Sequence, residues 1–215
     1  MTGRPPVQRF LIIVALLALL TLSGCRAASY FSQGNEHYDH GRYEKAIADY
    51  NEAIRLRPDD ADAYLNRGRA RNGLGDYEKA IADFDEAIRL QPDYVKAYNY
   101  RGAAYADLSR YDEAIASFDE AIRLRPDLAE THFIRGVTHA LFGRYEDAVA
   151  DFDEAIRLQP DDVTAYFIRG SSHADLGRYE KAIADLETAL ELAQADGNDT
   201  LAAKIEETLE AVRNP

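Results

Sequence analysis

Apolar residues recur at intervals of three and four along the segment Tyr77–Leu90. At about 100° of rotation per residue, they fall within one arc of about 120° on the surface of a helix. The apolar positions are Ala80, Ile81, Phe84, Ala87 and Ile88. This pattern predicts an amphipathic helix whose apolar face has to be covered by a neighbouring helix.

The same pattern returns with a period of 34 residues, which indicates a repeat architecture. Five columns of proline, glycine, tyrosine, alanine and a mainly aromatic position keep this interval. They are Pro58, Pro92, Pro126 and Pro160; Gly34, Gly68, Gly102, Gly136 and Gly170; Tyr43, Tyr77, Tyr111, Tyr145 and Tyr179; Ala46, Ala80, Ala114, Ala148 and Ala182; and Tyr50, Phe84, Phe118, Phe152 and Leu186. The columns predict five units, residues 27–60, 61–94, 95–128, 129–162 and 163–196. One unit cannot bury its apolar stripe alone, so neighbouring units must stack.

Glycine and proline give each unit the form of a helical hairpin. A glycine such as Gly68 has no side chain and lets the two helices of a hairpin approach closely. A proline such as Pro92 cannot continue the second helix and ends it. The fifth unit has Gln194 at the proline position. Apolar residues then follow at helical spacing, namely Leu201, Ile205, Leu209 and Val212. We therefore expect residues 197–215 to form a capping helix with a polar outer face.

The period and the columns resemble the tetratricopeptide repeat over residues 27–196. The resemblance implies an all-α, right-handed solenoid of five helix–turn–helix repeats. One departure is the residue before each glycine, where the family usually has leucine and this chain has Gln33, Arg67, Arg101, Arg135 and Arg169. These arginines fall on the inward arc of their helices, so we expect them to pair with acids of neighbouring helices or to reach water.

The first 24 residues have the order of a secretory signal peptide. Arg4 and Arg9 precede the apolar run Phe10–Leu22, and small residues follow. As a helix the run would extend roughly 20 Å, which is shorter than the roughly 30 Å hydrocarbon core of a bilayer. A cleaved signal over residues 1–24 is therefore favoured over a permanent membrane span.

The sequence Leu22-Ser23-Gly24-Cys25 resembles the lipobox of bacterial lipoproteins and contains the only cysteine. The resemblance implies a diacylglyceryl group on Cys25 and an acylated N-terminus, with residues 25–26 as a short tether and Ser29 as a candidate N-cap of the first helix. Arg26 stands where an aspartate tends to retain lipoproteins in the inner membrane, so we expect the outer membrane, facing the periplasm, if the source is Gram-negative. The alternative is an ordinary cleaved signal followed by a chance cysteine.

The formal net charge of −13 argues against a nucleic-acid partner, because phosphate binding needs clustered lysine and arginine. Acidic clusters recur on the second helices, as in DFDEAIRLQP at residues 83–92 and 151–160. Asp83 and Asp85 point about 200° apart on a helix and cannot share a metal ion. We interpret these clusters as solvated faces, in which Glu86 and Arg89 form weak ion pairs.

Nothing in the sequence has the spacing of a catalytic or cofactor site. His139 and His173 occupy equivalent positions in adjacent units, which is typical of packing. We therefore expect no enzyme activity, no metal and no cofactor.

The resemblance to tetratricopeptide arrays implies a partner on the concave face, which is formed by the first helix of each unit and holds peptides or helices in such arrays. The candidate residues are polar in the second and third units and mainly apolar in the fourth and fifth. They are Asn66, Arg69, Lys96, Asn99, Tyr100, Phe133, Ile134, Val137, Leu141, Phe167 and Ile168. An exposed apolar patch usually marks an interaction site, so we expect it to receive apolar anchors of a peptide or helix.

Two alternatives apply to this face. A second copy of the protein, forming a homodimer, or the capping helix would also cover the apolar patch.

Asn35, Asn66 and Lys96 match part of a clamp for a C-terminal carboxylate in some tetratricopeptide domains. However, Phe31 and Tyr100 replace its remaining lysine and arginine.

Overall fold

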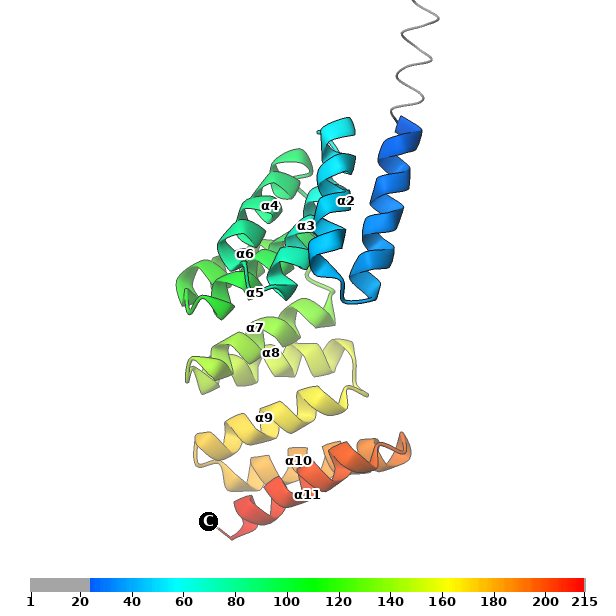
Figure 1. The fold of residues 1–215 in the computed structure, drawn as a ribbon. Coiled ribbons are helices and arrows are strands. Elements are labelled where there is room, and N and C mark those ends of the chain that lie inside the picture. Colours follow the sequence, from blue (N-terminus) through cyan, green and yellow to red (C-terminus); the bar gives the residue numbers. More distant parts are fainter. Residues whose placement is uncertain (1–23, 215) are drawn as a thin grey trace, which may run out of the picture. The chain divides into compact units, whose positions relative to one another are not determined.

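The computed structural model describes residues 24–214, and within this range it contains helices and no strand (Figure 1). The predicted all-α class and the helix–turn–helix organisation are confirmed. The chain divides into two compact units, which meet between Tyr100 and Arg101 within helix α5 (Val95–Asp107). We call them the N-terminal unit and the C-terminal unit and describe each by itself.

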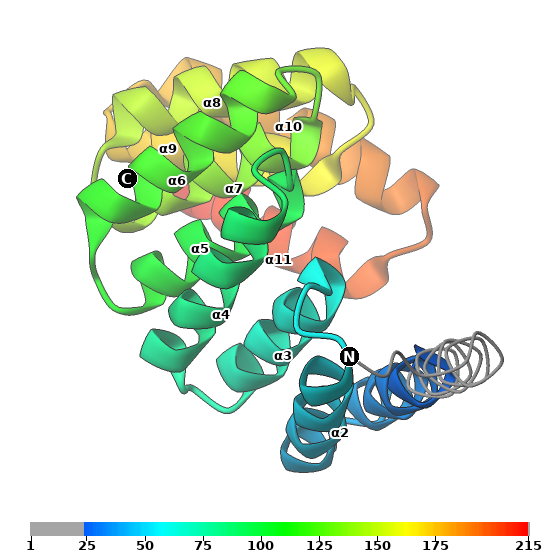
Figure 2. The same cartoon turned by 90° about the horizontal axis from the view of Figure 1, so that it is seen from above.

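The N-terminal unit begins with a helical segment at residues 24–39, which lies beside α2 (Figure 2). Its other helices are α2 (Tyr43–Leu56), α3 (Ala61–Gly73), α4 (Tyr77–Leu90) and the first part of α5. Tyr50 of α2 is almost fully buried and, with Ala46 and Ala70, forms a core on which Phe31 and Tyr38 pack. The columns of the repeat thus supply the core of this unit.

The predicted N-cap at Ser29 is wrong, because residues 24–28 are also helical. Ser29 lies inside the helix and accepts a hydrogen bond from Gln33 at 3.1 Å. Ala27 is 2% exposed. The first helix therefore takes up the residues expected to act as a tether. The expected signal peptide, apart from Gly24, lies outside the described residues.

The C-terminal unit contains the rest of α5 and six further helices in sequence, most of them visible one after another in Figure 1. They are α6 (Tyr111–Leu124), α7 (Ala129–Leu141), α8 (Tyr145–Leu158), α9 (Val163–Asp175), α10 (Tyr179–Ala195) and α11 (Asp199–Arg213). Helix α11 covers α10 with Ala202, Ile205, Leu209 and Val212, which share one buried cluster with residues of α10 such as Leu186. It has the position expected of the capping helix.

The glycine column lets the two helices of a hairpin touch, as predicted. A Cβ atom added to Gly102 would lie 2.6 Å from Cε1 of Phe118, a distance at which something must move. Gly136 faces Phe152 in the same way, at 3.0 Å. Since both phenylalanines are fully buried, any larger side chain at these glycines would push the helices apart.

Among residues 24–214, no helix is both long enough and apolar enough to cross a bilayer.

Candidate functional site

The arginines that precede the glycine column, which we call the arginine column, bind polar side chains of the second helix, and in three of the four cases this partner is an aspartate. Arg135 donates from Nε and Nη2 to both carboxylate oxygens of Asp151, at 2.9 and 2.6 Å. Arg169 does the same to Asp185, at 2.8 and 2.6 Å. Arg67 binds Asp83, and Arg101 donates to the Ser117 hydroxyl at 3.1 Å. The predicted pairing with acids of neighbouring helices is confirmed for Arg67, Arg135 and Arg169.

The same guanidinium groups also reach back to the preceding hairpin. Nη1 of Arg169 lies 2.6 Å from Asp153, and Nη1 of Arg135 lies 2.5 Å from Asp119. Burial opposes the charge of Arg135, but Asp151 and Asp119 hold its pKa above the ordinary value. Each of these arginines therefore joins two hairpins, and its role is structural.

The acidic clusters are not wholly solvated, and this part of the prediction is wrong. Asp83 is 3% exposed, Asp151 4% and Asp185 8%. On a helix, Asp83 lies only about 40° from Ala87, at the edge of the buried arc. Glu86 does face solvent, and Arg89 binds it at 2.6 Å as expected. Within residues 24–214, no group of these acids, histidines or Cys25 is arranged to hold a metal ion.

The buried histidines have the surroundings of packed side chains. His139 is 9% exposed, and its Nδ1 lies 2.6 Å from the Tyr111 hydroxyl. Burial lowers the pKa of His139, and the Asp151 carboxylate only partly offsets this effect. A buried imidazole of lowered pKa that contacts a tyrosine hydroxyl has the surroundings of a side chain packed between helices.

The first-helix face of the N-terminal unit carries a polar network. The carbonyl oxygen of Asn35 accepts from the Tyr50 hydroxyl at 2.8 Å and from the Asn66 amide at 3.2 Å. Arg69 in turn donates to Asn66 at 3.1 Å. The guanidinium of Arg69 lies 4.5 Å from the ring centre of Tyr38 and 5.2 Å from that of Tyr100. These side chains are therefore held in place before any partner binds.

The structure brings together two residues of the partial carboxylate clamp. Asn35 and Asn66 are in contact, and Arg69, which was not assigned to the clamp, completes their network. Lys96 is exposed and Asn99 is buried. Tyr100 stacks on Phe84, with ring centres 5.9 Å apart. The polar groups Asn35, Asn66 and Arg69 of this surface are thus bound to one another.

The first-helix face of the C-terminal unit carries an apolar pocket of about 270 Å³, which we call the α7–α9 pocket. Val137, Leu141 and Ile168, all predicted site residues, line it. Its other lining residues are Ala140, Tyr145, Ser171, Ser172 and Asp175. Leu141 is 76% exposed, which makes it the most exposed large apolar side chain of the described chain. The pocket offers an apolar floor with polar groups at α9.

Two of the predicted apolar anchors also contribute to the fold itself. The Phe133 ring packs edge-on against Phe152 of its own hairpin, with centres 5.8 Å apart. Phe167 packs against the cluster formed by α10 and α11, and the Lys204 amine lies 5.6 Å from its ring centre. The capping helix therefore covers part of the expected patch, at Phe167. Ile134 is half-buried.

Cys25, the candidate lipidation site, is exposed and lies in the first helical segment. The residues before Gly24 in the expected lipobox lie outside the described part of the chain.

A sequence model of the tetratricopeptide repeat matches residues 31–95, 72–129 and 135–199. Among curated proteins, no sequence match was found.

Solved structures of similar fold include MamA from Desulfovibrio magneticus RS-1, with a TM-score of 0.72 and 20% identity over 79% of this chain and 96% of that one. TTC0263 of Thermus thermophilus, described as a thermophilic TPR protein, has a TM-score of 0.67 and 24% identity, covering 85% and 98%. YrrB, described as a TPR protein with an unusual peptide-binding site, has a TM-score of 0.64 and 22% identity, covering 83% and 90%.

Proposed function

Because the chain belongs to the tetratricopeptide repeat family, we propose that it is a non-catalytic scaffold that binds another protein. The site is the α7–α9 pocket, and the ligand is an apolar side chain of a peptide or helix laid across the first helices. Asn66 and Arg69 are candidates for a polar binding surface of the N-terminal unit taken by itself. Lys96, Asn99 and Tyr100 are further candidates on that unit.

The observation that carries this proposal is the exposure of Leu141 at a pocket large enough for a side chain. Burying such a side chain contributes about 1.5–3 kcal/mol. Ser171 and Asp175 would supply hydrogen-bond partners to a backbone that passes over the apolar floor. Apolar anchors with a few polar groups are the usual composition of peptide-binding grooves.

We further propose that a lipid on Cys25 holds this scaffold at a membrane of the bacterial cell envelope. The support is the lipobox-like sequence and the exposed position of the thiol. If the source is Gram-negative, the expected location is the outer membrane, facing the periplasm. Holding a partner at the bilayer would raise its effective concentration for assembly there.

Selection from a peptide display library tests the binding site directly. Residues 24–215 would serve as bait, and enriched peptides would be titrated by calorimetry against the parent and Leu141→Asp. The matched control is Leu74→Asp, which changes an exposed leucine of the N-terminal unit that is far from this pocket in sequence. Because Leu141 is so exposed, helicity should be unchanged in the variant.

We expect Leu141→Asp to weaken binding of the selected peptides at least about tenfold and Leu74→Asp to leave it unchanged. Equal binding by all three proteins would overturn the assignment of the pocket. Sedimentation of the parent at rising concentration distinguishes a second copy as the occupant, since a dimer lost in Leu141→Asp alone would mean self-association.

The anchor is tested in a Gram-negative host fed an alkyne fatty acid. The full-length parent should carry the label and Cys25→Ser should not. A parent that is cleaved before Cys25 and remains unlabelled would show an ordinary signal peptide.

A further inference from the structure

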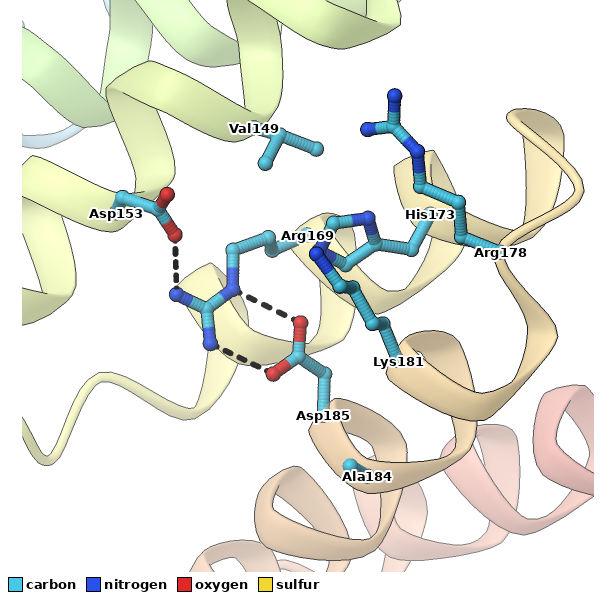
Figure 3. Close-up of a pocket in the computed structure, with 8 residues that line it drawn as sticks. All are labelled: Val149, Asp153, Arg169, His173, Arg178, Lys181, Ala184 and Asp185. Atoms are coloured by element: carbon cyan, nitrogen blue, oxygen red, sulfur yellow. Dashed lines mark hydrogen bonds and ion pairs between the residues drawn. The ribbon is translucent and has the colours of Figure 1, made fainter.

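Two pockets of the C-terminal unit are copies of one another, displaced by one repeat. The first, the α9–α10 pocket, has a volume of about 320 Å³ and is lined by Val149, Asp153, Arg169, His173, Arg178, Lys181, Ala184 and Asp185 (Figure 3). The second, the α7–α8 pocket, has a volume of about 350 Å³. It is lined by the residues 34 positions earlier, with Tyr111 in addition. This pair of pockets allows one site to serve as the control for the other.

The two pockets differ in charge at one position. Lys181 of the α9–α10 pocket is replaced by Asp147 in the α7–α8 pocket. With neutral histidines, the first pocket has three cations against two carboxylates, and the second has two cations against three. A positive pocket is unexpected in a chain with a formal charge of −13.

Both carboxylates of the α9–α10 pocket are already engaged. Asp153 and Asp185 bind the guanidinium of Arg169, which Figure 3 shows between them. The remaining cations, Arg178 and Lys181, flank the His173 ring in the same view. Because both carboxylates are bound to Arg169, the charges of Arg178 and Lys181 are not paired with them.

The groups around His173 lack the partners that their counterparts have. Arg144 lies 3.3 Å from Asp147 in the α7–α8 pocket, and the Nδ1 atom of His139 contacts Tyr111. In contrast, Lys181 makes no ion pair within residues 24–214, and Arg178 approaches only the exposed Glu146, at 3.6 Å. The Nδ1 atom of His173, a residue that is only 6% exposed, has no hydrogen-bond partner in this range. A buried polar atom without a partner costs about 1–3 kcal/mol.

In two other hairpins, the residues equivalent to Arg178 and Lys181 form an ion pair with each other. Asp76 pairs with Lys79 at 2.7 Å, and Arg110 pairs with Glu113 at 2.7 Å. In the first hairpin Arg42 and Lys45 are both basic, but His37 there is bound to Asp49 at 2.6 Å. Two adjacent cations next to an unpartnered histidine thus occur, among these hairpins, at α9 and α10.

We propose that the α9–α10 pocket binds a phosphate-sized oxyanion, either free or as a phosphate monoester, between Arg178 and Lys181 with His173 as the third contact. Such an anion would neutralise two cations that otherwise repel each other at i and i+3. It would also provide a charged partner for the imidazole ring. The site lies apart from the α7–α9 pocket, so it does not depend on the proposed peptide binding.

The charges around His173 predict how binding and protonation are linked. Burial lowers the pKa of its imidazole; Asp185 opposes this effect, and Lys181, Arg169 and Arg178 add to it. Asp153 of α8 faces the same pocket but is bound to Arg169. A bound anion stabilises the imidazolium form, so it should raise this pKa, and by reciprocity binding should strengthen as pH falls.

The test is a titration of residues 24–215 with sulfate and phosphate at constant ionic strength, followed by NMR of the histidine rings. Sulfate is included because its charge is constant from about pH 5.5 to 8, whereas phosphate has a pKa of about 6 to 7 and changes charge there. His173 signals are assigned from the His173→Gln variant. Phenyl phosphate in parallel distinguishes a monoester site from one that admits only the free ion.

We expect a saturable shift of the His173 signals, an increase in the pKa of this ring, and no comparable change at His139. Lys181→Asp, which reproduces the Asp147 arrangement at an exposed position, should weaken the response about tenfold or more. Unsaturated or equal shifts of both rings, or an unchanged response in Lys181→Asp, would overturn the proposal.

Discussion

Ile168 and Arg169 are adjacent in α9, yet they belong to two regions with opposite behaviour along the chain. Arg169 lies in the arginine column, where the same bidentate geometry recurs at Arg67 and Arg135. Ile168 lies on the first-helix face, where the corresponding side chains change from Asn66 to Ile134 without a change of helix geometry. The comparison indicates that the repeat keeps the contacts that join hairpins and varies the surface offered to partners.

The largest effect is expected where the constant region is broken. Arg135→Met leaves Asp151 buried without its guanidinium, and we expect a loss of about 3–5 kcal/mol in the free energy of unfolding. Urea unfolding followed by circular dichroism measures it, since the chain has no tryptophan. The loss should be largest at neutral pH and above, where His139, 3.6 Å from Asp151, is uncharged because burial lowers its pKa.

Arg157→Met is the matched control, because Arg157 forms an exposed pair with Glu154 and its replacement should have little effect on stability. The double variant Arg135→Met/Asp151→Met should recover much of the stability. If Arg135→Met costs no more than Arg157→Met, the arginine column does not hold the hairpins together.

A smaller effect is expected on the variable face of the N-terminal unit. Arg69→Met removes two cation–π contacts and a hydrogen bond to Asn66, and should cost about 1–2 kcal/mol. The same unfolding measurement applies, with hydrogen exchange in α3 as a local readout. Arg69→Lys should recover only part of the loss, because an ammonium lacks the planar fork. If Arg69→Met is as stable as the parent, the contacts of Arg69 do not stabilise the fold.

The smallest effect concerns the histidines beside the arginine column. Burial lowers the pKa of both His139 and His173 in the folded state, so the unfolded chain takes up their protons first as the pH falls. Their contribution to stability is complete above about pH 6.5 and is lost as the pH falls below it. Unfolding free energies in a phosphate-free buffer should therefore decrease from about pH 7.5 to 5.5.

Replacing both histidines with glutamine should flatten this dependence. An unchanged slope in the double variant would show that other groups cause it.

The repeat columns were sufficient to predict the helices, the hairpins and the capping helix, because their spacing is a property of the chain itself. The burial of Asp83 also follows from its helical position about 40° from Ala87, although the acidic cluster taken as a whole predicts a polar face. The packing contacts of Phe133 and Phe167 could not be predicted, for another reason. Their helical angles are those of exposed positions, but a long aromatic ring reaches Phe152 or the α11 cluster, and this contact depends on the partner helix.

The pocket around His173 shows the same limit. The exchange of Asp147 for Lys181 can be read from the repeat alignment of the sequence alone. The difference in tyrosine partners cannot be predicted in this way. His139 contacts Tyr111 and His173 has no such partner, although Tyr111 and Tyr145 occupy equivalent positions in the repeat. Tyr145 instead lines the α7–α9 pocket, a difference set by local packing.

The two-sided reach of the arginines has a consequence for how such a chain grows. Arg169 binds one acid 16 residues ahead and another 16 residues behind, so a hairpin carries both a connector and the acid that the next connector needs. A duplicated segment of 34 residues is therefore already compatible with its own neighbours. Gene duplication can lengthen or shorten the array in whole steps, while each new copy is left to diverge on the surface that meets other molecules.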